Sequence, residues 1–112
     1  MAQITQLINR NGNGAVNQFV IHEDNGDIAF QSYSSRVCEI RKTNQFDAII
    51  VFGCDWDYSR TTVKHLCIFL EDNEFDLHNK ADIEKALKHS EQYGYVELNG
   101  KTVAMWVDDT MM

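Results

Sequence analysis

The segment Phe46–Phe52, which reads FDAIIVF, decides the class of fold that this chain adopts. A short, nearly unbroken apolar run of this kind is typical of a β-strand that is covered on both faces. Shortly after it, Val63, Leu66, Cys67 and Leu70 recur at the spacing that gives an α-helix one apolar stripe. We therefore expect a helix that packs on a sheet containing this strand.

On the N-terminal side of the run, the sequence predicts three more strands joined by tight turns. Residues 16–22 alternate as a strand does, and Asn25-Gly26 is a strong signal for a two-residue type I′ hairpin turn. The return strand covers residues 28–33, and a third strand covers residues 36–41. The strand residues expected to meet the helix stripe are Phe19, Ile21, Ile49 and Val51.

On the C-terminal side, the chain carries end signals for two helices and a final hairpin. Ser59 is a suitable N-cap for the first helix, and Asn79 is one for the second, with Asp82 in its first turn. Gly94 is placed to end the second helix, and Asn99-Gly100 predicts another type I′ turn. The order β-β-β-β-α-α-β-β predicts an α+β fold, an antiparallel sheet of about six strands with two helices packed on one face.

The 112 residues are expected to fold as a single domain, since a chain of this length buries one core. Ile4, Leu7 and Ile8 fall at helical spacing before a joint rich in Asn and Gly. Residues 1–14 are therefore expected to be a short helix or a flexible arm. Residues 108–112 are expected to be a frayed tail.

Charge and cysteine content narrow the class of protein. The formal net charge of −7 disfavours direct binding to nucleic acid, but it suits a surface that occupies a basic groove. The same charge also keeps a small protein soluble, and this alternative stays open. No apolar run reaches membrane-spanning length, we expect no secretory signal, and the three cysteines are expected to be reduced. We expect an intracellular, cytoplasmic protein without membrane contact.

Cys54, His65, Cys67 and His78 are the residues that could bind a metal, but they lack the close CxxC or HxxxH spacing of a zinc site. We interpret the cysteines as core thiols and expect no metal. The chain also has no nucleophile elbow, P-loop or dinucleotide fingerprint. A noncatalytic protein without a cofactor is therefore expected, while catalytic partners that meet only in space stay an alternative.

The most distinctive segment is Asp55–Thr62, which reads DWDYSRTT. Trp, Tyr and Arg are the usual anchors of protein interfaces, so this segment is a candidate partner-binding site. The alternative is a locked strand-to-helix corner, in which Trp56 and Tyr58 pack under the helix and Tyr58 meets Val63 as a hydrophobic staple. The candidate contact residues in this segment are Asp55, Trp56, Asp57, Tyr58 and Arg60.

A cluster of acidic residues follows the first predicted helix. These residues would share one face with Asp55 if the loop after the helix folds back along it. A solvated rim of acidic side chains is the other interpretation, because helix ends and loops are normally polar. The candidate partner-binding residues in the cluster are Glu71, Asp72, Glu74 and Asp76.

Two motifs carry a resemblance to a known group of proteins. They are FQSY at Phe30–Tyr33 and WDYSRTT at Trp56–Thr62, followed by Lys64 and Phe69-Leu70. In these motifs the chain resembles a group of short bacteriophage proteins of unknown function, over residues 17–70. The resemblance implies a shared hairpin, two further strands and a helix that begins at an aromatic corner. It also implies a phage origin, and it transfers no site residue.

The first functional hypothesis is a noncatalytic phage-type accessory protein that binds and modulates a host protein in the host cell cytoplasm. The expected partner is a host-defence or nucleic-acid-handling protein, and an anti-CRISPR-like inhibitor is the sharpest version. A small enzyme or ligand-binding domain without a recognisable motif is one alternative, and an oligomeric virion or assembly component is another. An exposed acidic or aromatic patch favours the first, a deep pocket the second and a large apolar self-complementary face the third.

Overall fold

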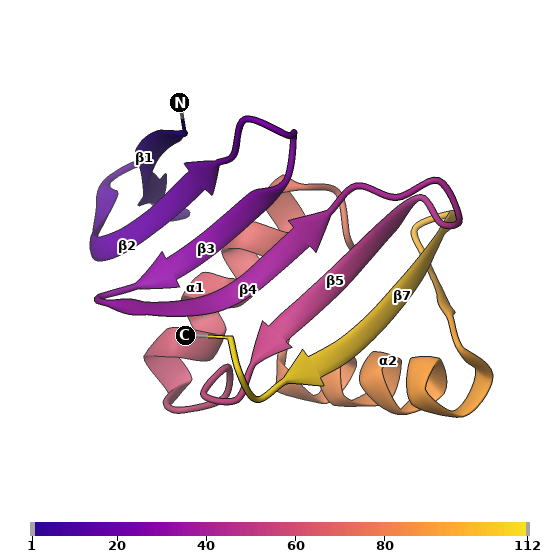
Figure 1. The fold of residues 1–112 in the computed structure, drawn as a ribbon. Helices are drawn as coiled ribbons and strands as arrows, with labels where there is room; N and C mark the ends of the chain where they lie inside the picture. The colour runs from indigo at the N-terminus through magenta and orange to yellow at the C-terminus, as the bar shows by residue number, and fades with distance from the viewer. Residues whose placement is uncertain (1, 112) are drawn as a thin grey trace.

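The computed structural model describes residues 2–111, which form one seven-stranded sheet with two helices against it (Figure 1). The α+β fold expected from the sequence is confirmed, with one strand more than the six expected. The helices are α1 (Arg60–Asp72) and α2 (Lys80–Tyr93). The strands are β1 (Gln3–Ile8), β2 (Gly14–His22), β3 (Ile28–Ser32), β4 (Ser35–Arg41), β5 (Ala48–Gly53), β6 (Val96–Leu98) and β7 (Lys101–Asp108).

The strands lie in the order β1-β2-β3-β4-β5-β7-β6. The first five form an antiparallel meander, and β6 and β7 form an antiparallel hairpin. β7 pairs with β5 in parallel, with Ala48 opposite Val103 and Gly53 opposite Asp108. The sheet is therefore mixed, because the chain crosses over through α1 and α2 before it returns to β5.

The expectation of a short helix or flexible arm at residues 1–14 is wrong. Gln3–Ile8 is the edge strand β1, and it pairs with β2. Only Leu7 is buried there, whereas Ile4 and Ile8 are 65% and 50% exposed. Ile4, Leu7 and Ile8 therefore do not form the buried side of a helix. Pairing with β2 determines the conformation of the segment instead.

Two hairpins use the same loop, which is longer than the two-residue turn expected at Asn25-Gly26. The Glu23 N–H donates to the Asp27 carbonyl at 2.8 Å, and the Gly26 N–H donates to the Glu23 carbonyl at 3.1 Å. The loop at residues 9–13 repeats both bonds. Each is a turn followed by a glycine at positive φ, the usual three-residue hairpin loop. The turn at residues 99–100 does have the two positive φ angles that type I′ requires.

The predicted helix ends are confirmed. The Ser59 side chain accepts a hydrogen bond from the Thr62 N–H, and the Asn79 side chain accepts one from the Asp82 N–H. Gly94 follows α2 in the left-handed conformation, with φ of 85°. Neither helix among the described residues is long and apolar enough to cross a bilayer.

The expected tail at residues 108–112 is also ordered as far as the structure describes it. β7 runs to Asp108, whose carbonyl accepts a hydrogen bond from the Met111 N–H at 3.2 Å. Met111 is 9% exposed and lies beside Gly53. Residues 109–111 are therefore a turn against the end of β5, and Met112 lies outside the described residues.

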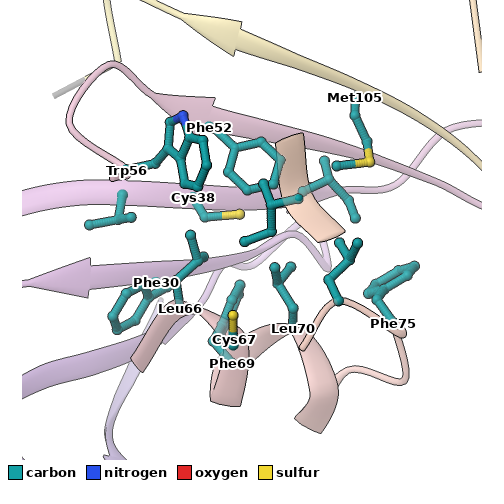
Figure 2. Close-up of a cluster of buried hydrophobic side chains, with 14 of the residues drawn as sticks. Phe30, Cys38, Phe52, Trp56, Leu66, Cys67, Phe69, Leu70, Phe75 and Met105 are labelled. Carbon is teal, nitrogen blue, oxygen red and sulfur yellow. The ribbon is translucent and has the colours of Figure 1, made fainter. Parts of the chain in front are cut away.

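The apolar core lies between α1, α2 and one face of the sheet (Figure 2). Leu66, Phe69 and Leu70 of α1 face this side of the sheet, and the rings of Phe69 and Phe30 stack with centroids 5.6 Å apart. The helix stripe is as predicted, but its strand partners are not. The core residues on the strands include Phe30, Cys38, Ile50 and Phe52, whereas the expected Phe19, Ile21, Ile49 and Val51 lie outside the core cluster.

The error arises because β5 is apolar on both faces. Neighbouring residues of a strand point to opposite faces, so Ile50 and Val51 face opposite sides of the sheet. Both are completely buried, and the sequence pattern does not distinguish the side that the helices cover. The face opposite the helices is thus partly apolar as well.

Candidate functional site

A cavity of about 620 Å³ lies where the middle of β2 and the end of β3 meet the start of α1. We call it the Gln18 pocket. Met111 contributes to it from the C-terminal turn, and the structure places Tyr33 and Tyr58 among its lining residues. The polar residues that define it are Gln18, Ser32, Asp55, Ser59 and Thr62.

Gln18 is the most unusual residue of the pocket. It is only 2% exposed, and its Oε1 has no hydrogen-bond partner within the protein. Its Nε2 makes one long bond, 3.4 Å, to the Val16 carbonyl. Most buried polar atoms in proteins have a partner, because an unpaired one costs about 1–3 kcal/mol. A buried amide oxygen without a partner, in the wall of a cavity, therefore indicates a place for a donor from outside the protein.

Two other buried polar side chains lie beside it. Ser32 pairs with Gln18 across β2 and β3 and is 8% exposed. Thr62 reaches the pocket from the first turn of α1 and lies 3.0 Å from Ser59, oxygen to oxygen. One end of the core is therefore polar.

Backbone geometry at two positions gives the pocket its shape. Asn17 and Tyr33 adopt φ of 60° and 55°, and the Tyr33 N–H donates to the Asn17 carbonyl at 2.7 Å. The left-handed residue in β2 breaks its alternation, so that Ala15 and Gln18 are both buried although they are three positions apart. Positive φ is uncommon for a residue as bulky as tyrosine, and such conformations cluster at functional sites.

His65 lies one turn further along α1. It is 8% exposed, and its Nδ1 has no hydrogen-bond partner. Burial, and then the charge of Lys64, lowers the pKa of His65. The imidazole is therefore neutral at pH 7, and the polar end of the core carries no buried positive charge from it.

The mouth of the pocket is aromatic and acceptor-rich. Tyr58 is 81% exposed and Tyr33 is 65% exposed. The Asp55 carboxylate, which lines the pocket, makes no ion pair with any described residue. Arg36, the cation of the lining, is held by Glu23 at 3.3 Å and Glu39 at 3.2 Å. The free charge at the mouth is thus negative.

In the Asp55–Thr62 segment, Trp56 fits the interpretation as a strand-to-helix corner, whereas Tyr58 fits the interpretation as an exposed contact residue. Trp56 is 6% exposed and packs edge-on against Phe52, with centroids 5.7 Å apart, so it is a corner residue and no surface contact (Figure 2). Tyr58 is almost fully exposed, and the predicted staple with Val63 is therefore wrong. Asp57 forms an ion pair with Lys80 at 3.7 Å.

The acidic residues in the last turn of α1 and in the loop after it do not gather with Asp55. Glu71 pairs with Arg10 and, at 2.9 Å, with His78, and Asp72 also pairs with Arg10, at 3.6 Å. The hydrogen bond to Glu71 raises the pKa of His78. Asp76 lies 3.9 Å from the same histidine. Glu74 is exposed at φ of 69°, and its carbonyl accepts a bond from Lys101.

A second cavity, of about 640 Å³, lies between α1, the start of α2 and Arg10. Arg60, the remaining candidate residue, is exposed and lines it together with Lys64. Other cations of its lining are already paired with carboxylates, as Lys80 is with Asp57 and Arg10 with Glu71. This gathering of cations in an acidic chain was not predicted from the sequence.

The core-thiol prediction holds for only part of the set. Cys38 and Cys67 are buried, and burial raises the pKa of Cys38 well above its ordinary value and that of Cys67 to about 11. Cys54 is exposed at the Gln18 pocket, because it follows β5 and lies outside the covered strand. All three thiols are free, and residues 2–111 contain no group of three or more His, Cys, Asp or Glu side chains that could hold a metal.

Sequence reasoning found one wall of the pocket and missed the other. Asp55 and Tyr58 were candidates, whereas Gln18, Ser32 and Tyr33 were not. The sequence signal for the missed wall is a glutamine that the expected alternation places on one strand face with Val16 and Val20. The FQSY and WDYSRTT motifs, at residues 30–33 and 56–62, come together in space at this pocket.

The chain is similar to a known protein family over most of its length. A family model described as "Family of unknown function (DUF8033)" matches residues 2–85, which include every lining residue of the Gln18 pocket except Met111. The search of curated proteins and the search of solved structures found no match. Because the family model covers most of the chain, the protein belongs to this family of unknown function, DUF8033.

Proposed function

We propose that this protein is a noncatalytic phage-type accessory protein that binds and modulates a host protein, and that the Gln18 pocket is its contact site. The observation that carries the proposal is the pairing of two exposed tyrosines, Tyr33 and Tyr58, with a buried glutamine that has no partner. Exposed tyrosines around a desolvated pocket are typical of binding hot spots. Their side chains contribute large contact areas and lose little conformational freedom.

The charge of the chain supports a basic partner. The net charge of −7 favours encounter with a positive surface, and Asp55 supplies an unpaired carboxylate at the mouth of the pocket. Proteins that handle nucleic acids carry such surfaces. We therefore propose a host-defence or nucleic-acid-handling protein of the host cytoplasm as the partner, with an anti-CRISPR-like inhibitor as the most specific version.

One observation favours a second candidate, a small ligand-binding domain. The volume of the Gln18 pocket, about 620 Å³, lies within the range of small-molecule sites. In that case the tyrosines would cover a bound metabolite instead of contacting a protein.

Affinity capture from a bacterial lysate, read out by mass spectrometry, tests the proposal. The bait variants are Tyr58→Ala and Tyr33→Asn, since asparagine tolerates positive φ. The matched control is Tyr93→Ala, a 59% exposed tyrosine at the end of α2 and outside the pocket. We expect the parent and the control to retain a protein that both pocket variants lose. Equal capture by all four chains would contradict the proposed contact site.

A further inference from the structure

We propose that the Gln18 pocket receives an arginine side chain of the partner protein. This inference rests on the proposed function and specifies the chemistry of the contact. Three features of the pocket support it: the buried acceptor in the wall, the free charge at the mouth and the aromatic side chains beside it.

The wall offers one buried acceptor that lacks a donor. Gln18 Oε1 is buried and unpaired, and Ser32 and Thr62, whose hydroxyl is bonded to that of Ser59, line the same pocket. A guanidinium group has five N–H donors and no acceptor, so it can bond several of these oxygens at once. A ligand that offers only acceptors would leave Gln18 Oε1 unpaired.

The charge at the mouth selects a cation. Asp55 has no ion-pair partner among the described residues, while the charge of Arg36 is balanced by Glu23 and Glu39. The neutral state of His65 leaves no competing positive charge in the polar end of the core. An anionic ligand would meet the carboxylate of Asp55, and no described cation of the lining is free to offset it.

The tyrosines favour arginine over lysine. Tyr33 and Tyr58 present exposed rings beside the cavity, and the planar guanidinium stacks on aromatic faces. It is also more weakly hydrated than an ammonium group, so its transfer into a partly buried pocket costs less. The acceptors, carboxylate and rings of this one pocket thus match different parts of an arginine side chain.

The test is an NMR titration of the ¹⁵N-labelled protein with N-acetyl-arginine-N-methylamide. We expect saturable shifts of the Gln18 side-chain amide and the Tyr58 backbone amide, with a Kd on the order of 1 mM for so small a probe. The same derivatives of lysine and citrulline are the matched ligands. Citrulline keeps the shape of arginine and has no charge, so we expect it to bind at least about tenfold more weakly.

Variants locate the binding in the pocket. Gln18→Met should weaken arginine binding by about 10–100-fold, the value of a hydrogen bond to a charged group, and Asp55→Asn by about 2–5-fold. Tyr93→Ala should bind as the parent does. As a second readout, arginine should slow the alkylation of Cys54, the exposed thiol at the pocket.

Two results would overturn the inference. One is equal binding of arginine by the parent and by Gln18→Met, and the other is equal binding of citrulline and arginine by the parent. If the tyrosine variants lose the captured protein but arginine does not bind, the proposed function stands and the arginine inference fails. If arginine binds in the pocket but the captured proteins are unchanged, the proposed contact site fails, and with it the assignment of the arginine to a partner.

Discussion

Ser90 and Gln18 are buried polar side chains at different ends of the core, and they differ in whether their oxygen has a hydrogen-bond partner. Ser90 of α2 is 5% exposed, and its Oγ accepts a hydrogen bond of 2.8 Å from the Met105 N–H of β7. β6 pairs with β7 only as far as Val103. Ser90 therefore bonds a part of β7 that lies beyond the end of β6. Gln18, at the α1 end, is buried more completely and has an unpaired oxygen.

The difference separates structural roles from binding roles. The hydrogen bond of Ser90 satisfies a backbone group and joins a helix to a strand, so it stabilises the fold. Burial of Gln18 desolvates an amide oxygen that has no partner, which destabilises the fold. The one long hydrogen bond of its Nε2 offsets this only in part. In natural proteins, buried polar groups without a partner occur mainly at functional sites. Substitutions at Ser90 and Gln18 should therefore have different effects on stability.

The largest effect is expected for Leu66→Ala in α1. Leu66 is completely buried in the core, and apolar packing holds α1 to the sheet. The substitution should lower the free energy of unfolding by about 2–5 kcal/mol, because it removes buried methyl groups and leaves a cavity. Urea denaturation measures this, with Lys64→Ala as the control on the outer side of the same helix. An unchanged midpoint for Leu66→Ala would show that α1 does not pack as described.

The next effect is expected for Ser90→Ala. It leaves the buried N–H of Met105 without an acceptor, which should cost about 1–3 kcal/mol. Hydrogen exchange of the Met105 amide should accelerate beyond the global change in stability. Ser34→Ala, in the exposed turn between β3 and β4, is the control and should alter neither value. Continued protection of the Met105 amide in Ser90→Ala would mean that another acceptor replaces the serine.

A smaller effect on stability is expected for Gln18→Met. Methionine is similar in size and removes the unpaired oxygen, so the free energy of unfolding should stay within about 1 kcal/mol of the parent or increase. Gln18→Ala is the matched comparison, since it leaves a cavity and should destabilise. A loss of several kcal/mol in Gln18→Met would show that the amide supports the fold, and the contrast with Ser90 would fail.

The smallest effect concerns two histidines, His65 within α1 and His78 in the loop between α1 and α2. Burial lowers the pKa of His65 below its ordinary value of 6.5, so stability should fall as the pH drops from 6.5 through the folded pKa. The hydrogen bond to Glu71 raises the pKa of His78, so its contribution is full below pH 6.5 and is lost as the pH rises through the folded pKa. NMR titration should find the two on opposite sides of 6.5. His78→Gln should remove only the second change.

The fold was largely predictable where local chemistry decides the structure. The caps at Ser59 and Asn79, the end at Gly94 and the turn at residues 99–100 depend on neighbouring residues, and all four are found. The pairing of β5 with β7 could not be predicted in the same way, because it joins segments that are distant in sequence. The strand at residues 3–8 was missed for a related reason, since its conformation depends on the partner strand.

The residues of the candidate site also differ in whether neighbouring residues or distant contacts identify them. Asp55 and Tyr58 were found because they stand in one distinctive segment, whereas Gln18 becomes unusual only when its lack of a partner is seen. The left-handed turn at Asn17 places this side chain at the polar end of the core, and the residue type alone does not predict it. The corner interpretation predicted the burial of Trp56, but its partner Phe52 is known only from the structure.

The parallel pairing of β5 and β7 also has a kinetic consequence. β5 acquires its second neighbour only after α1, α2 and β6 have followed it, and contacts between such distant segments form late in folding. Until then, the segment Ala48–Phe52 presents an open, strongly apolar strand edge, the kind that templates intermolecular β-pairing. The interval before β7 arrives is therefore the period in which newly made chains are most prone to aggregate. Slow synthesis at low temperature, which keeps the concentration of such chains low, favours recovery of the folded protein.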